Sequence, residues 1–88
     1  MNWQIEIKPN AEKQYLKLDQ KTRKRIKESL KQLESAENPF RHNNVKALSG
    51  ELRGDYRLRV GKWRVLFSPE KKSKLLSVYA ILPRGDAY

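Results

Sequence analysis

The sequence has no cysteine, a single histidine and no long apolar run. Without cysteine there is no disulfide and no thiolate metal site, a composition compatible with a reducing cytoplasm. No carboxylates or histidines recur at metal-ligand spacing, so we expect no metal and no other cofactor. The first residues lack the apolar segment of a signal peptide, and no stretch approaches transmembrane length. We therefore expect a cytoplasmic protein that does not enter a membrane.

Acidic residues are also scarce, since 20 Lys and Arg stand against 10 Asp and Glu in 88 residues, a formal net charge of +10. Such an excess favours binding to nucleic acid, to an anionic membrane surface or to an acidic protein. The membrane is the weakest of the three, because no basic helix here has a broad apolar face. The length predicts one domain, residues 1–88, with a single sheet and one layer of helices.

One stretch alternates twice between polar and apolar residues, over Tyr56–Val60 and again over Trp63–Ser68. Only Gly61 and Lys62 lie between the two runs. Two alternating runs with a two-residue link that contains glycine are typical of a β-hairpin. Glycine in the first position suits a type II′ turn, in which that residue has a positive φ. The sequence therefore predicts a tight hairpin.

The turn sets the register of the hairpin, with Arg59 opposite Arg64. Because side chains alternate between the two faces of a strand, Arg57 lies on the same face as these two arginines. The opposite face is apolar and is expected to point to the core, with Leu58, Val60, Trp63, Val65 and Phe67. Like charges opposite one another destabilise a sheet. The arginine face (Arg57, Arg59 and Arg64) is therefore either a solvated basic surface or a binding site for an anion.

The residues before the hairpin predict a strand at Trp3–Ile7 followed by two helices, the first capped by Asn10 and the second by Asp19. An apolar stripe marks the second helix, residues 20–37, whose first turns carry Lys21, Arg23, Lys24, Arg25 and Lys27. Cations at a helix N-terminus oppose the macrodipole. These five residues are therefore either a solubilising face or contacts to a phosphate backbone. The lone His42 falls in a polar loop and is interpreted as a surface residue.

After the hairpin, Leu75–Leu82 is almost wholly apolar and predicts a central strand. If it pairs antiparallel with Trp63–Ser68, Val78 lies on the core face, and Tyr79 and Ile81 lie on the arginine face. Val45–Leu48 is a short extended run. The predicted fold is α+β in the order β-α-α-β-β-β, with an antiparallel twisted sheet and an αα-hairpin packed on one face.

Three stretches resemble the RelE/ParE toxin superfamily: Leu48–Gly50, Tyr56–Phe67 and Pro83–Tyr88. The resemblance implies the RelE-like microbial RNase fold. RelE-type members are ribosome-dependent endoribonucleases that cut mRNA in the A site, whereas ParE-type members share the fold and poison DNA gyrase. The partners implied are an acidic RelB-like antitoxin, the 70S ribosome with its rRNA, and mRNA. Operator DNA would be bound only through the antitoxin complex.

The same resemblance implies a catalytic set made of Arg57, Arg59, Arg64, Arg84 and Tyr88. We expect further contacts to RNA or ribosome from Lys21, Arg23, Lys24, Arg25, Lys27, Lys46, Lys62 and Tyr79. The best-known RelE pattern has lysines at positions 57 and 59. Arginine effectively keeps its proton, so these two residues are expected to bind phosphate rather than act as a general base. Two alternatives remain: a ParE-like gyrase inhibitor without catalysis, and a basic nucleic-acid-binding module.

Overall fold

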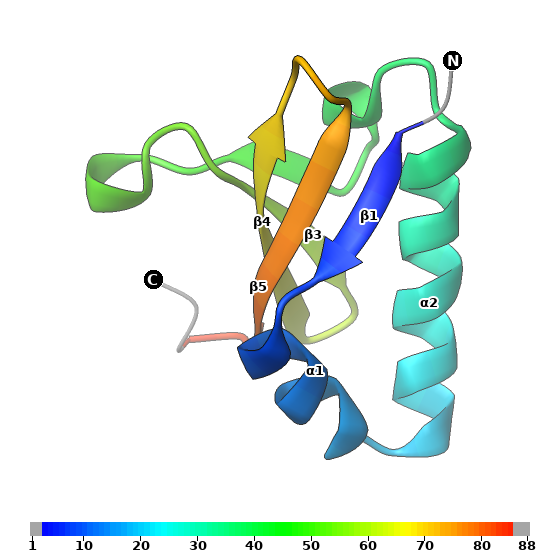
Figure 1. Cartoon of the computed structure of the whole chain (residues 1–88). Helices are drawn as coiled ribbons and strands as arrows, with labels where there is room; N and C mark the ends of the chain where they lie inside the picture. The colour runs from blue at the N-terminus through cyan, green and yellow to red at the C-terminus, as the bar shows by residue number, and fades with distance from the viewer. Residues whose placement is uncertain (1–2, 86–88) are drawn as a thin grey trace.

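Five strands and two α-helices follow one another along residues 3–85, the part of the chain that this computed structural model describes (Figure 1). The helices are α1 (Pro9–Leu16) and α2 (Gln20–Ser35), with single 3-10 turns at η1 (Pro39–Arg41) and η2 (Gly50–Leu52). The strands are β1 (Gln4–Ile7), β2 (Val45–Ala47), β3 (Tyr56–Val60), β4 (Trp63–Glu70) and β5 (Leu75–Pro83). No helix in this range is long and apolar enough to cross a membrane. The predicted catalytic residue Tyr88 lies outside the described residues.

The strands form one open sheet in the order β1-β5-β4-β3-β2, which confirms the predicted α+β fold. The pairs β3–β4 and β4–β5 are antiparallel, as predicted, and β2, which the predicted order did not include as a strand, pairs antiparallel with β3. The edge strand β1 instead runs parallel to β5, so the sheet is mixed. Short links force neighbouring strands to run antiparallel. β1 is joined to the rest of the sheet through two helices, and no such link sets its direction.

Local signals explain where the two helices begin. Pro9 occupies the first turn of α1, where its missing N–H costs no hydrogen bond, and Lys8 is the N-cap. The prediction of Asn10 as N-cap was wrong, because its side-chain amide donates to the carbonyl of Tyr79 at 3.2 Å. The prediction for α2 is confirmed, since the Asp19 carboxylate accepts from the backbone N–H of Thr22 at 3.3 Å.

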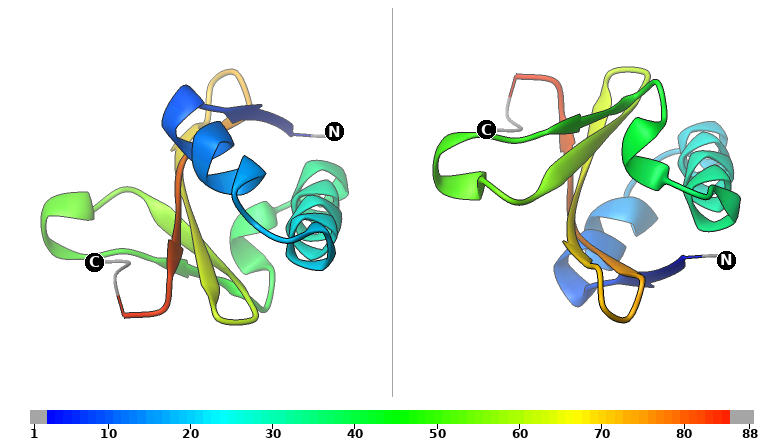
Figure 2. Two further views of the ribbon diagram at one scale, coloured as in Figure 1. Left: turned by 90° about the horizontal axis from the view of Figure 1, so that it is seen from below. Right: turned by 90° about the horizontal axis from the view of Figure 1, so that it is seen from above.

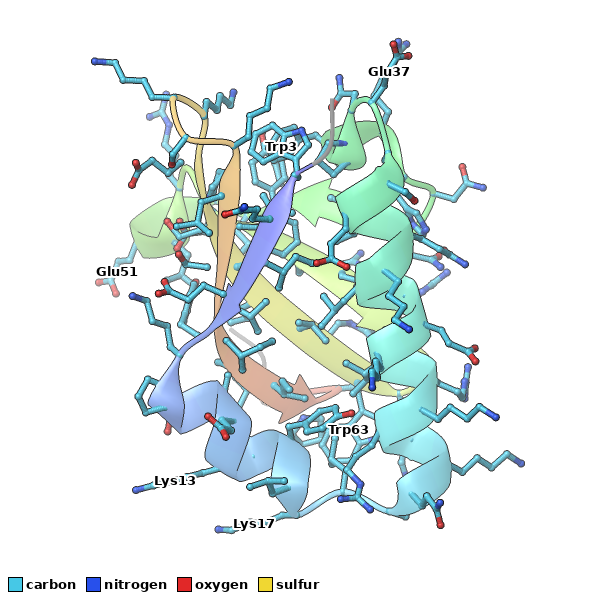
Figure 3. The ribbon with its side chains drawn as sticks, turned by 45° about the vertical axis from the view of Figure 1, so that its right-hand side comes forward. Trp3, Lys13, Lys17, Glu37, Glu51 and Trp63 are labelled. Carbon is cyan, nitrogen blue, oxygen red and sulfur yellow. The ribbon has the colours of Figure 1, made fainter. Side chains whose placement is uncertain are left out.

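Both helices pack on the same face of the sheet and enclose the core (Figure 2). From the helices, Ala11, Ile26 and Leu33 are fully buried. They meet the apolar face of the hairpin, where Leu58, Val60, Val65 and Phe67 are buried as predicted. Figure 3 shows Trp63 at the end of the sheet beside the link between the helices, and Trp3 at the opposite end. The side of the sheet away from the helices carries the three arginines.

A β-bulge changes which residues of β5 face the core. Leu66 pairs with Ala80, but Phe67 pairs with Val78, so Tyr79 is an extra residue in β5. The prediction that Ile81 lies on the arginine face was therefore wrong, since Ile81 pairs with Val65 and is buried in the core. Tyr79 does lie on the arginine face, where it packs against a second apolar cluster of Leu48, Leu66 and Ala80.

Candidate functional site

The β3–β4 hairpin holds its arginines in the predicted register. Arg59 pairs with Arg64, and Arg57 pairs with Leu66. Gly61 has a φ of +60°, whereas Lys62 keeps a negative φ, as a type II′ turn requires. Arg59 and Arg64 are therefore held opposite each other by the backbone pairing of the hairpin alone, despite their like charges.

The three guanidinium groups of the arginine face are oriented by neutral acceptors. Arg64 Nη1 donates to the carbonyls of Trp63 at 3.1 Å and Gly61 at 3.3 Å. Arg59 Nη2 lies 3.4 Å from Asn44 Oδ1, and Arg57 Nη1 lies 3.5 Å from the Asn44 carbonyl. Carbonyl and amide oxygens fix the direction of a side chain and leave its full charge.

Almost none of the positive charge is neutralised by ion pairs. Over residues 3–85, the one ion pair within 4.0 Å joins Lys8 and Glu6, at 3.0 Å on the edge strand β1. This contact holds the pKa of the Glu6 carboxyl below its usual value. In the described structure, the arginine face therefore presents cations without a carboxylate partner.

Arg59, Arg64 and Arg84 come together around a hollow of about 390 Å³, which Asn44 and Gly61 complete. We call it the arginine hollow. Arg84 follows β5, and its backbone N–H donates to the carbonyl of Lys62 at 2.7 Å, which ties it to the hairpin turn. Three cations around one space suit a phosphate group, because guanidinium offers bidentate contacts to phosphate oxygens. The sequence had indicated that Arg84 could reach this rim.

Arg57 lies next to the arginine hollow but does not line it. It faces a separate hollow of about 570 Å³ with Lys46, which pairs with it across β2 and β3. Leu48, Ser49, Glu51 and Leu52 complete that wall. The predicted catalytic arginines are thus divided between two separate hollows.

Sequence reasoning missed Asn44, which contacts Arg57 and Arg59 and lines the arginine hollow. Its backbone N–H donates to Nδ1 of His42 at 3.1 Å, so that nitrogen must be unprotonated. His42 Nε2 then carries the proton and donates to Gln32 Oε1 of α2 at 2.9 Å. His42 therefore links α2 to the residue that orients two arginines. The register of β2 and β3 would have placed Asn44 opposite Arg59, but a three-residue strand gives little sequence signal.

Tyr79, predicted as an RNA contact, donates its hydroxyl to Asp55 Oδ2 at 2.8 Å. Burial raises the pKa of this phenol far above its usual value, and the hydrogen bond to Asp55 and its negative charge raise it further. The phenol thus stays protonated and holds the start of β3 against β5. Its role as an RNA contact stays a prediction.

The other predicted cations are spread over three places. Lys62 is exposed in the hairpin turn, and Lys21 and Lys24 are exposed on α2, where Arg23 is half-buried. Lys27 lines an apolar groove between the helices. Arg25 of α2 lies against the hairpin turn: a Cβ atom on Gly61 would lie 3.1 Å from its Nη1. Between Trp3 and Gly85 there is also no group of three His, Asp or Glu side chains placed to hold a metal ion.

Residues 5–88 match the family model of the ParE toxin of the type II toxin–antitoxin system parDE. The chain belongs to this toxin family. Within the wider RelE/ParE superfamily, it is similar to the toxin in the archaeal RelE–RelB complex from Pyrococcus horikoshii OT3, with 29% identity and a TM-score of 0.80. That match covers 99% of this chain and 100% of the other.

Two further solved structures share the fold. The RelBE2 toxin–antitoxin complex from Mycobacterium tuberculosis has a TM-score of 0.78 and 18% identity, over 98% of this chain and 95% of the other. The isolated E. coli RelE toxin has a TM-score of 0.73 and 16% identity, over 97% and 87%. Comparison with curated proteins gave no significant match. The chain is therefore a toxin of a toxin–antitoxin system with the RelE-like fold.

Proposed function

We propose that this RelE/ParE toxin is a ribosome-dependent endoribonuclease that cleaves mRNA in the A site and so inhibits translation. The observation that carries the proposal is the arginine hollow, in which Arg59, Arg64 and Arg84 surround one space of about 390 Å³ without a carboxylate partner in the described residues. Three converging guanidinium groups suit an RNA phosphate, because each can make bidentate contacts to its oxygens.

The chemistry proposed is attack by the neighbouring 2′-OH on the phosphorus. The 2′ oxygen loses its proton and forms a bond to phosphorus, the bond to the 5′ oxygen breaks and that oxygen takes up a proton, and the products are a 2′,3′-cyclic phosphate and a 5′-hydroxyl. The phosphorane formed on the way carries extra negative charge on its equatorial oxygens. Fixed cations directed at those oxygens stabilise it more than the ground state. Arg57, Arg59, Arg64 and Arg84 are proposed for this role, together with Tyr88, which could stack on a base.

Proton transfer is not assigned to these arginines, because guanidinium effectively keeps its proton at working pH. We propose that positioning and electrostatic stabilisation supply most of the rate. The ribosome, through its rRNA, would hold the mRNA in the geometry required for in-line attack. This dependence explains why so small a set of side chains could suffice.

Toeprinting on translating ribosomes tests the proposal. The toxin should produce new mRNA ends within the A-site codon, and the pattern should require ribosomes. Intact mRNA at saturating toxin would contradict it. The family model that matches is that of ParE, so gyrase inhibition is the second candidate. Inhibition of supercoiling by purified gyrase, with mRNA left intact, would favour that alternative.

We also propose an acidic, RelB-like antitoxin as partner, because the similar structures from P. horikoshii and M. tuberculosis are toxin–antitoxin complexes and this chain is strongly basic. An apolar groove of about 530 Å³ between the helices and β1 offers a place for it, with Leu16 60% exposed, and with Lys27 and Lys31 on the wall beside Glu12 and Glu34. An amphipathic acidic helix would cover the apolar side chains and pair with the lysines. Operator DNA would then be bound through the antitoxin. Titration calorimetry with the product of the adjacent gene tests this pairing.

A further inference from the structure

The guanidinium of Arg25 lies over the tip of the β3–β4 hairpin. Nη1 and Nη2 of Arg25 would be 3.1 and 3.4 Å from a Cβ atom on Gly61, so only glycine leaves the arginine undisturbed there. Figure 1 shows this turn reaching toward α2. Arg25 makes no ion pair within 4.0 Å with the acidic side chains of residues 3–85. An unneutralised cation of α2 is thus carried to the edge of the arginine face.

A smaller hollow, of about 170 Å³, lies between α2 and the hairpin, and we call it the turn hollow. Across it, Arg25, Glu28, Ser29 and Gln32 of α2 face Asn44 and Arg59. It shares Asn44, Arg59 and Gly61 with the arginine hollow. The two hollows therefore adjoin along Arg59, and a bound chain could pass from one to the other without leaving the cationic surface.

The composition of the turn hollow suits a phosphate group. It offers two guanidinium groups, one hydroxyl and two side-chain amides, all of which can donate to non-bridging oxygens. Its volume equals that of about five to six waters at ~30 Å³ each, which is room enough for one such group. Glu28 is the one carboxylate on its wall, and its charge would oppose an anion.

We propose that the turn hollow binds a second backbone phosphate of the same RNA strand, next to the phosphate in the arginine hollow. The proposal rests on the endoribonuclease function above and adds a subsite to it. Arg59 contacts both phosphates, and Arg25 contacts only the second. Of the five cations in the first turns of α2, Arg25 is thereby singled out as the one that touches the substrate strand.

The test uses ribosomes programmed with mRNA that carries one uncharged methylphosphonate linkage, moved in turn along the positions that flank the cleaved bond. On unmodified mRNA, Arg25→Ala should raise the toxin concentration for half-maximal cleavage about tenfold or more, the size typical of a hydrogen bond to a charged group. At one linkage, the methylphosphonate should raise the half-maximal concentration of the wild-type toxin by a similar factor. It should leave the half-maximal concentration of Arg25→Ala unchanged.

Lys13→Ala is the matched control, because it removes one charge from an exposed position on the outer side of α1 (Figure 3). It should behave as wild type does at every linkage. Arg25→Ala is expected to fold, since the position is exposed and alanine favours helix. Circular dichroism checks this, and Arg25→Lys, which keeps the charge and helix propensity, should restore part of the affinity.

Glu28→Gln supplies a test of opposite sign, because loss of the opposing charge should lower the half-maximal concentration. The subsite is overturned if Arg25→Ala behaves as Lys13→Ala does. It is also overturned if the loss of cleavage that Arg25→Ala causes relative to wild type is the same at every methylphosphonate linkage. It is also overturned if Glu28→Gln weakens cleavage. Wild-type toxin that cleaves no unmodified mRNA would overturn the endoribonuclease function and the subsite together, so the two failures are distinguishable.

Discussion

Replacing Arg64 by alanine separates the chemistry of the arginine hollow from the stability of the fold. The side chain points away from the helices and lines the hollow, so its removal leaves no cavity in the core. Two hydrogen bonds disappear, to the carbonyls of Gly61 and Trp63. The repulsion between Arg64 and its cross-strand neighbour Arg59 disappears as well.

These effects on stability nearly cancel. Each hydrogen bond contributes about 0.5–1.5 kcal/mol, with the lower value expected where the carbonyl can turn to water. Removing a like-charge pair returns about 0.2–1 kcal/mol. The free energy of unfolding should therefore change by about 1 kcal/mol or less, which is at most about 4–8 °C in Tm for a domain of this size. Cleavage should fall by about 10²–10³, the cost of removing one preorganised donor.

Thermal unfolding followed by circular dichroism measures the first quantity, and single-turnover cleavage of ribosome-bound mRNA measures the second. Lys13→Ala again serves as a control for loss of one charge. Cleavage by Arg64→Ala at the wild-type rate would refute the assignment of this hollow as the reaction site. An unfolded variant would refute the assignment of Arg64 to the solvent side of the sheet.

Three other perturbations probe neighbouring features of the same surface. Arg57→Lys and Arg59→Lys should each keep part of the cleavage rate, because the charge remains and the bidentate geometry is lost, whereas alanine at either position should cost about 10²–10³. An alanine variant as fast as wild type in single-turnover cleavage would remove that residue from the site. The raised pKa of Tyr79 means that its phenol ionises first in the unfolded chain, so the free energy of unfolding should fall as pH rises beyond about 10. Urea unfolding at pH 8 and 10.5 measures this, and the free energy of unfolding should fall less between these pH values in Tyr79→Phe than in wild type. An unchanged pH dependence in the variant would contradict the hydrogen bond to Asp55. Gly61→Ala should destabilise the toxin by about 1–2 kcal/mol, because alanine resists a φ of +60°. Urea unfolding measures it, and unchanged stability would show that the turn relaxes to another type.

The hairpin was predictable because its register depends on only two residues. Gly61 and Lys62 fix the turn, and the turn fixes every cross-strand pair from Val60 outward. The apolar stripe of α2 and its Asp19 cap were equally local signals. For the same reason the amino-acid pattern alone places Arg57, Arg59 and Arg64 on one face of the sheet.

The features that could not be predicted depend on contacts between distant segments. The direction of β1 follows from packing of two helices, and no local pattern encodes it. Asn44 orients the arginines through a strand of three residues, too short for a pattern of alternation. The position of Arg25 over Gly61 joins residues from a helix and a turn that only the folded chain brings together.

The extra residue at Tyr79 reverses the alternation of side chains along β5, the last strand. Before it, even-numbered positions such as Leu76 and Val78 point to the core; after it, the odd-numbered Ile81 does. Leu82 thereby comes to lie beside Arg64, and the chain leaves the strand at Arg84 on the rim of the arginine hollow. If β5 paired regularly beyond Val78 with all of its residues, Ile81 instead of Leu82 would lie opposite Arg64, and Arg84 would be displaced by one position. The bulge therefore sets the register in which the end of β5 pairs with the hairpin.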